Sequence, residues 1–278
     1  VFSPKIGSES DAEGWKNLKK SLDIVWRLVL WRQGKLLTRT YEASLPMEER
    51  LLFPGRETSS VVRLMHMDAS GKAMFCFDET SGRHCPVVFS KAEQELFNAF
   101  EDENSTHIAL RELMGLLYAC TLLGVKYPDT ILDACNDNQV VVAWLNGKAT
   151  SCPKAAQMLY LISMAQTIGK FDARMRWVDT ATNVFADRGS REVGEGELEA
   201  LLAEWRLANP GKQTEEVPVP PFLRELGWAG TGVLTHEVAD PAALTRMLFD
   251  YWHTKGFDMG RSASELNELK LIFDQHVK

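Results

Sequence analysis

The chain has 278 residues, 45% of them hydrophobic and 25% charged, which are ordinary proportions for a globular protein. No apolar run approaches the ~20 residues that span a bilayer, and there is no secretory signal, so we expect no membrane association. The net charge of -7 argues against a strongly basic surface that would attract nucleic acid. Any contacts with phosphates are therefore expected from local basic clusters or from a partner domain.

The first 59 residues predict a helix followed by an irregular connection. Asp11 and Glu13 precede apolar residues at helical spacing, which favours a helix over residues 9–34. Residues 35–59 contain Leu45-Pro46 and Phe53-Pro54-Gly55, which indicate a connecting segment.

Three short strands are expected next. Residues 61–67 form an apolar run typical of a buried strand, and tight turns separate it from strands over residues 72–77 and 84–89. Short strands joined in this way predict an antiparallel meander. The stretch Ser90-Lys91-Ala92-Glu93 then fits a capping box, so a short helix is expected to follow.

Helices and single strands alternate from about residue 105. We expect a helix from Ser105 or Thr106 to about Leu123, a strand over 130–135, helices over 138–146 and 154–168, a strand over 173–178 and a helix over 183–190. The order βββ-α-β-α(α)-β-α over residues 60–192 predicts an α/β domain, with a five-stranded mixed sheet and helices on both faces.

Residues 193–278 are expected to form a helical C-terminal extension. An acidic amphipathic helix over 195–207 precedes a proline-rich linker, 209–221, and two further helices cover about 241–255 and 262–277. Trp205, Trp228 and Trp252 lie in this extension and suggest a docking surface.

The cysteines indicate the compartment. The five cysteines form no CxxC pair and no spacing with histidine typical of a metal site. Their odd number and apolar surroundings predict buried free thiols in a reducing intracellular compartment, with nucleus, cytoplasm and organelle all open. Because the chain begins with Val1 rather than Met, we expect an expressed segment, a processed product or part of a larger polypeptide.

Four acidic residues lie where a metal-dependent nuclease needs them: Asp68 after the first strand, Glu112 in the long helix, Asp137 after the fourth strand and Asp187 in the last helix of the domain. In a mixed sheet of this order the first and fourth strands can lie side by side, which would bring these carboxylates together. Four neighbouring carboxylates repel one another unless cations intervene, and Mg²⁺ requires oxygen ligands. Two Mg²⁺ ions about 4 Å apart would relieve the repulsion and serve phosphodiester hydrolysis.

Taken singly, each acid also has an ordinary interpretation. Asp137 could cap the helix that follows, and Glu112 could be a solvated helix residue. Asp187 with Arg188 could be a surface ion pair, and Asp68 could belong to a turn.

Together, four stretches resemble a known family. They are Asp68-Ala69-Ser70 and residues 107–113 (HIALREL), 136–147 (NDNQVVVAWLNG) and 183–191 (NVFADRGSR). They look like the ribonuclease H domain of retroelement reverse transcriptases, most closely the tyrosine-recombinase (DIRS-like) retrotransposon type. The chain departs from that pattern at Ala73, Phe75 and Ala109, at Trp177 where some members carry histidine, and in lacking Pro-Gly before Asn183.

The resemblance covers about residues 60–192 and implies a ribonuclease H-like fold. It implies that Asp68, Glu112, Asp137 and Asp187 are catalytic and hold two Mg²⁺ ions, for which Mn²⁺ would substitute. The implied activity is endonucleolytic cleavage of the RNA strand of RNA–DNA hybrids, with the 2′-hydroxyls as the distinguishing contact. Candidate substrate contacts are Ser70, Asn138, Arg188 and Arg191.

The family normally carries a polymerase domain, so the expected partners are an RNA–DNA hybrid or other nucleic acid and a polymerase domain or larger complex. The alternative is a catalytically idle ribonuclease H-like domain, captured as a scaffold or binding subunit of a larger assembly. The acidic charge, the lack of a polymerase domain and the added helical tail favour this alternative, whereas the intact quartet of acids favours the enzyme.

Overall fold

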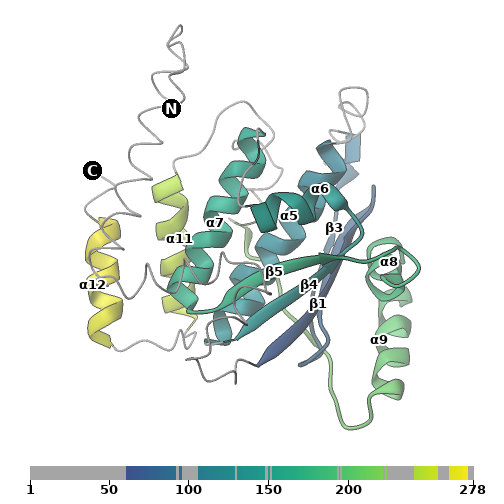
Figure 1. Ribbon diagram of the computed structural model, residues 1–278. Helices are drawn as coiled ribbons and strands as arrows, with labels where there is room; N and C mark the ends of the chain where they lie inside the picture. The colour runs from purple at the N-terminus through teal and green to yellow at the C-terminus, as the bar shows by residue number, and fades with distance from the viewer. Residues whose placement is uncertain are drawn as a thin grey trace, which may run out of the picture.

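The structure, a computed structural model, describes residues 61–91, 94–95, 106–128, 130–147, 150, 152–192, 194, 196–221, 223, 241–255 and 263–274 (Figure 1). The predicted elements over residues 1–59 lie outside the described residues, as does part of the helix expected after Ser90. The helices and strands are β1 (Val62–Ala69), β2 (Ala73–Asp78), β3 (Arg83–Val88), α5 (Thr106–Tyr118), β4 (Ile131–Asn136), α6 (Gln139–Gly147), α7 (Pro153–Gly169), β5 (Asp172–Trp177), α8 (Val184–Arg191), α9 (Glu197–Ala208), β6 (Glu215–Glu216), α11 (Pro241–Thr254) and α12 (Ala263–Asp274).

The strands form one mixed sheet in the order β5-β4-β1-β2-β3-β6. The predicted antiparallel meander is confirmed, and β1 also pairs in parallel with β4, which pairs in parallel with β5. The sheet has six strands rather than the predicted five, because Glu215–Glu216 pairs in parallel with β3. A strand of two residues has no periodicity to reveal it, and this one lies in the segment that the prolines indicated as a linker.

The central strands are buried on both faces of the sheet. Successive side chains of a strand point to opposite faces. On β2, Met74 and Cys76 join the larger core with residues of α5 and α7, while Phe75 and Phe77 join a smaller cluster with Trp205 of α9. Helices therefore cover both faces of the sheet, as predicted, with α5 and α7 on one side and α8 and α9 on the other (Figure 1). The chain has an α/β fold.

Helix α5 continues into a π turn, Ala119–Leu123, and a 3-10 turn, Gly124–Lys126, where the regular α-helical hydrogen bonds change partners. Residues far along the chain bind this end of the helix. The indole N–H of Trp252 donates to the Thr121 carbonyl at 2.7 Å, and the Tyr118 hydroxyl donates to the Leu223 carbonyl at 3.1 Å. The C-terminal part of the chain is thus anchored to the helix that carries Glu112.

The same helix corrects one expectation from composition. By length and composition alone, the 19 residues Ile108–Lys126 would suffice to cross a bilayer, so the expectation that no apolar run approaches that length was wrong. Of the most apolar window in this stretch, 94% is buried inside the fold, as is usual for the core helix of a folded domain.

Two of the tryptophans proposed as a docking surface are core residues, so that prediction was wrong for them. Trp252 is fully buried in the larger core. Trp205 is also buried, and its ring meets that of Phe77 edge-on with centroids 5.0 Å apart. Trp228 lies outside the described residues. The helical pattern of these residues does not distinguish a face that docks onto a partner from one that packs on the chain's own core.

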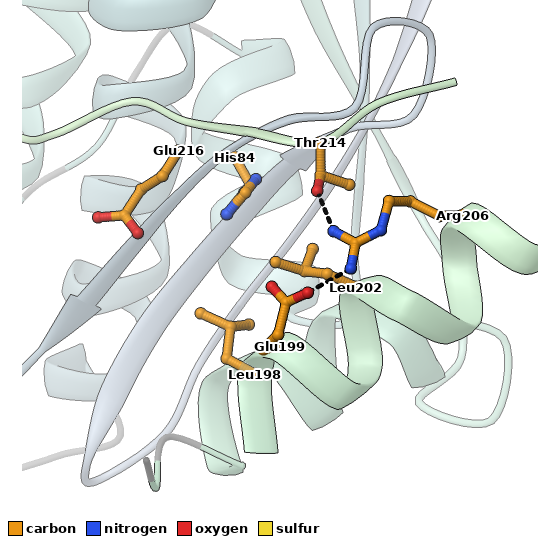
Figure 2. Close-up of a pocket in the computed structure, with 7 residues that line it drawn as sticks. All are labelled: His84, Leu198, Glu199, Leu202, Arg206, Thr214 and Glu216. Atoms are coloured by element: carbon orange, nitrogen blue, oxygen red, sulfur yellow. Dashed lines mark hydrogen bonds and ion pairs between the residues drawn. The ribbon is translucent and has the colours of Figure 1, made fainter. Parts of the chain in front are cut away.

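A pocket of about 390 Å³ lies between α9 and the β3–β6 edge of the sheet (Figure 2). Arg206 spans part of it, donating to Thr214 Oγ1 at 2.6 Å and pairing with Glu199. None of the four predicted metal ligands and none of the predicted substrate contacts lines this pocket, whose lining residues are His84, Leu198, Glu199, Leu202, Arg206, Thr214 and Glu216.

The anchoring of α11 can be tested by substitution. Trp252→Ala would remove a fully buried indole and its hydrogen bond to Thr121, so we expect the free energy of unfolding to fall by about 3–5 kcal/mol, measured by urea denaturation. Met247→Ala, on the same helix but 44% exposed, is the matched control and should change it by less than about 1 kcal/mol. Equal, small effects of the two substitutions would contradict this role of α11.

Candidate metal centre

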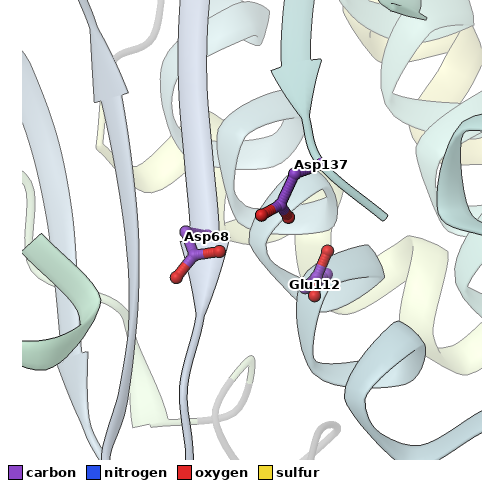
Figure 3. A group of neighbouring side chains, drawn as sticks. All are labelled: Asp68, Glu112 and Asp137. Atoms are coloured by element: carbon purple, nitrogen blue, oxygen red, sulfur yellow. The ribbon is translucent and has the colours of Figure 1, made fainter. Parts of the chain in front are cut away.

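Three of the four predicted metal ligands converge at the centre of the sheet (Figure 3). Asp68 lies near the end of β1, Asp137 directly follows β4, and Glu112 lies on α5. The parallel pairing of β1 with β4 places the two strand ends together, and α5 packs over β1 and β2. One carboxylate oxygen from each residue lies within 4.8 Å of the others, so the three form a group able to hold a metal ion.

Glu112 is the most informative of the three, because its side chain is buried and incompletely satisfied. The residue is only 4% exposed, and its Oε1 accepts a hydrogen bond of 3.4 Å from Asn138 Nδ2. Its buried Oε2 has no hydrogen-bond partner. A buried oxygen without a donor is costly, and a cation between the three acids would satisfy it. The residues present therefore fit a hard cation such as Mg²⁺, which takes oxygen ligands.

The electrostatics of the group agree with this interpretation. Burial, followed by the charges of Asp68 and Asp137, raises the pKa of Glu112 to about 8. Burial also raises the pKa of Asp68 to about 6, against the hydrogen bond from Ser190, and the charges of Asp137 and Asp187 add to the rise. Without a cation these carboxylates therefore resist ionisation.

Helix α8 is fixed to β1 beside the acids. Ser190 Oγ lies 2.5 Å from Asp68 Oδ2, and Ser70 Oγ donates to the Ser190 carbonyl at 2.7 Å. Asn183 Nδ2 donates to the Met67 carbonyl at 3.0 Å. Position 189 must be glycine, because a Cβ there would lie 2.3 Å from a ring atom of Phe75. These contacts set the distance between α8 and the sheet.

Asp137 is held from the side of β5. Thr180 Oγ1 donates to Asp137 Oδ2 at 2.7 Å, and the indole N–H of Trp177 donates to the Asp137 carbonyl at 3.0 Å. Trp177 is nevertheless 50% exposed, so a large apolar surface lies beside the acids in a fixed orientation.

Asp187 stands apart from the other three acids. It is not in the group whose oxygens lie within 4.8 Å of one another, and its Oδ1 accepts a hydrogen bond of 2.6 Å from Arg191 Nε, one helical turn further on. It remains close enough that its charge contributes to the raised pKa of Asp68. The structure thus brings together three of the four predicted ligands and pairs the fourth with an arginine.

The four predicted substrate contacts fall in different places. Asn138 touches Glu112, and Arg191 lies at the site through Asp187. Ser70 is half-buried, and its hydroxyl binds the backbone of α8 and of its own turn. Arg188 is bound in a fork by Glu204, at 2.6 and 3.2 Å, and also by Glu192 at 2.9 Å, so it is tied to α9 rather than to the acids.

Three residues at the site were not singled out from the sequence, namely Thr180, Asn183 and Ser190. Ser190 and Asn183 lie in the stretch NVFADRGSR on which the family resemblance partly rests, so a signal for them was present. Thr180 carries no such signal, because only the fold brings its hydroxyl to Asp137.

No family model, no curated protein and no solved structure matches the chain.

The raised pKa values lead to a prediction for the metal-free protein. Since the folded-state pKa of Glu112, about 8, is above that of an unfolded glutamate, the folded state binds more protons between about pH 5 and pH 8. Stability therefore falls as the pH rises through this window. Glu112→Gln should remove much of this fall and raise the free energy of unfolding near pH 8 by on the order of 2 kcal/mol, measured by urea denaturation with a chelator present.

The matched control is Glu95→Gln, a change of the same chemistry at an exposed position, which should leave the profile unchanged. If the parent and Glu112→Gln lose stability equally between about pH 5 and pH 8, the burial of a carboxylate at position 112 does not govern the profile.

Proposed function

We propose that this chain is a metal-dependent endonuclease with a ribonuclease H-like fold, derived from a retroelement reverse transcriptase, that hydrolyses the RNA strand of RNA–DNA hybrids. The observation that carries the proposal is the convergence of Asp68, Glu112 and Asp137, with an unpartnered buried oxygen on Glu112. These acids belong to the stretches whose sequence resembles that family. The ordinary interpretations explain each acid singly, but they give no reason for burying Asp68 and Glu112 next to each other and beside the half-buried Asp137.

Asp68, Glu112 and Asp137 would hold Mg²⁺, with Mn²⁺ as a substitute. Asp187, whose charge acts on Asp68, would contribute to a second ion. The chemistry that Mg²⁺ supplies at such a site is activation of water and neutralisation of charge on the phosphodiester oxygens.

The chain's own residues would orient the acids and bind the substrate. Thr180 fixes the Asp137 carboxylate, and Ser190 fixes that of Asp68, so neither has to be ordered when substrate arrives. Arg191, whose side chain is 63% exposed, supplies a cation for a phosphate. The exposed indole of Trp177 offers a surface against which a sugar or base can pack.

The second candidate function is that of a catalytically idle scaffold or binding subunit in a larger, nucleic-acid-containing assembly. The net charge of -7 favours it, since an acidic chain attracts nucleic acid weakly unless a partner contributes basic surface. A polymerase domain is the partner that the family resemblance suggests. The five cysteines are all free, and we propose a reducing compartment for either function.

Cleavage of a labelled RNA–DNA hybrid tests the proposal. The parent should cut the RNA strand in the presence of Mg²⁺ and leave single-stranded RNA and duplex DNA intact. Asp137→Asn should lower the rate on the order of 100-fold or more, because it removes a charge from the metal centre while keeping the shape of the side chain.

Asp250→Asn makes the same change at an exposed position on α11 and should leave the rate unaltered. Absence of hybrid cleavage by the folded parent would sink the enzymatic proposal and favour the scaffold.

A further inference from the structure

The ion pair between Arg191 and Asp187 lies at the edge of the acid group rather than away from it. Arg191 Nε is 2.6 Å from Asp187 Oδ1, and the guanidinium is close enough to interact electrostatically with Asp68 and Asp137 as well. Arg191 is therefore a positive charge of the protein itself, paired with Asp187 at the edge of the three converged acids.

The backbone that carries Asp187 cannot move far from Asp68. Ser190 Oγ lies 2.5 Å from Asp68 Oδ2 and 3.0 Å from the Asp187 carbonyl oxygen, and Gly189 lies directly against the ring of Phe75. Because the backbone is fixed, the ion pair with Arg191 determines whether the Asp187 carboxylate faces the other acids. That pair is partly exposed, with 63% of the arginine side chain and 23% of the aspartate side chain accessible, so it can open without disturbing the core.

The ion pair changes the net charge that a cation meets at the site. When all four are ionised around a cation, Asp68, Glu112, Asp137 and Asp187 carry four negative charges, and Arg191 offsets one of them. A first divalent cation among the three converged acids leaves one net negative charge. A second divalent cation would then turn the site positive unless Arg191 moves away or a phosphate arrives.

We propose that Arg191 is an internal counter-ion that controls the uptake of the second divalent cation. One ion binds between Asp68, Glu112 and Asp137, and the second binds only when a substrate phosphate draws Arg191 from Asp187. The same arginine would then hold that phosphate, as a bidentate donor. The inference rests on the proposed metal-dependent function and adds to it that substrate and the second ion bind cooperatively.

The neighbouring arginine on the same helix provides a matched control. Arg188 is held by Glu204 and Glu192 and makes no contact with the acid group. Arg188→Gln and Arg191→Gln therefore remove the same charge from α8, but only Arg191→Gln releases Asp187.

Calorimetric titration of the full chain with Mn²⁺, without nucleic acid, tests the inference. The parent and Arg188→Gln should bind one ion in the accessible concentration range. Arg191→Gln should bind a second ion at least about tenfold more tightly than the parent does. Adding Asp187→Asn to Arg191→Gln should abolish that gain. Thermal unfolding of each variant checks that the fold is kept.

The titration distinguishes the counter-ion role of Arg191 from metal binding by the three acids. If Arg191→Gln binds Mn²⁺ with the stoichiometry and affinity of the parent, the counter-ion role is overturned while the metal centre stands. If the folded parent binds no ion at all, the proposed function fails and the inference with it.

A second measurement addresses the phosphate contact. In the presence of a chelator, Arg191→Gln should weaken binding of a labelled RNA–DNA hybrid and lower the slope of log affinity against log salt concentration by about 1. An unchanged slope would overturn the transfer of Arg191 to a phosphate.

Discussion

The parallel pairing of β1 with β4 at the centre of the sheet is the contact on which the rest of the structure depends. It joins a strand of the antiparallel meander to the strand that follows the long helix, so α5 must pass over the sheet between them. The ends of both strands then meet, with Asp68 on one and Asp137 after the other, and α5 adds Glu112 from above. The convergence of the three acids is thus a consequence of topology, although they are separated by 44 and 25 residues in the chain.

The same arrangement holds carboxylates that repel one another close together in the folded state. Burial alone disfavours the charged forms of Glu112 and Asp68. The charges of Asp68 and Asp137 raise the pKa of Glu112 further, and those of Asp137 and Asp187 raise the pKa of Asp68. A protein selected only for stability would place apolar or hydrogen-bonded groups at these positions. The surrounding contacts instead hold the carboxylates in place: Ser190 binds Asp68, Thr180 binds Asp137 and Asn138 binds Glu112. Rigid, partly unsatisfied carboxylates are typical of a site that completes itself with a cation.

Most of the sheet and the three converging acids could be predicted from the sequence, because strands, turns and caps leave local patterns. The strand predicted over 130–135 is β4, Ile131–Asn136, and the helix predicted over 154–168 is α7, Pro153–Gly169. What could not be predicted depends on contacts across the fold. Strand β6 pairs with the edge of β3, and the buried Trp252 donates to the Thr121 carbonyl, and both contacts join segments far apart in the chain. Asp187 and Arg191 are four residues apart on a helix, a spacing that permits their ion pair but does not require it, because the side chains can adopt other conformations.

The C-terminal helices have a direct bearing on the acid group. Glu112 lies on a continuous helical rod from Thr106 to Lys126, whose far end changes from α to π and 3-10 geometry. At that end, Trp252 binds the Thr121 carbonyl and Leu223 accepts a hydrogen bond from Tyr118. A helix fixed at one end and packed on the sheet at the other cannot rotate about its axis, and such a rotation would remove Glu112 from Asp68 and Asp137. Residues 223 and 241–255 are therefore part of the structure that positions the acids, even though they lie beyond the stretches that resemble ribonuclease H.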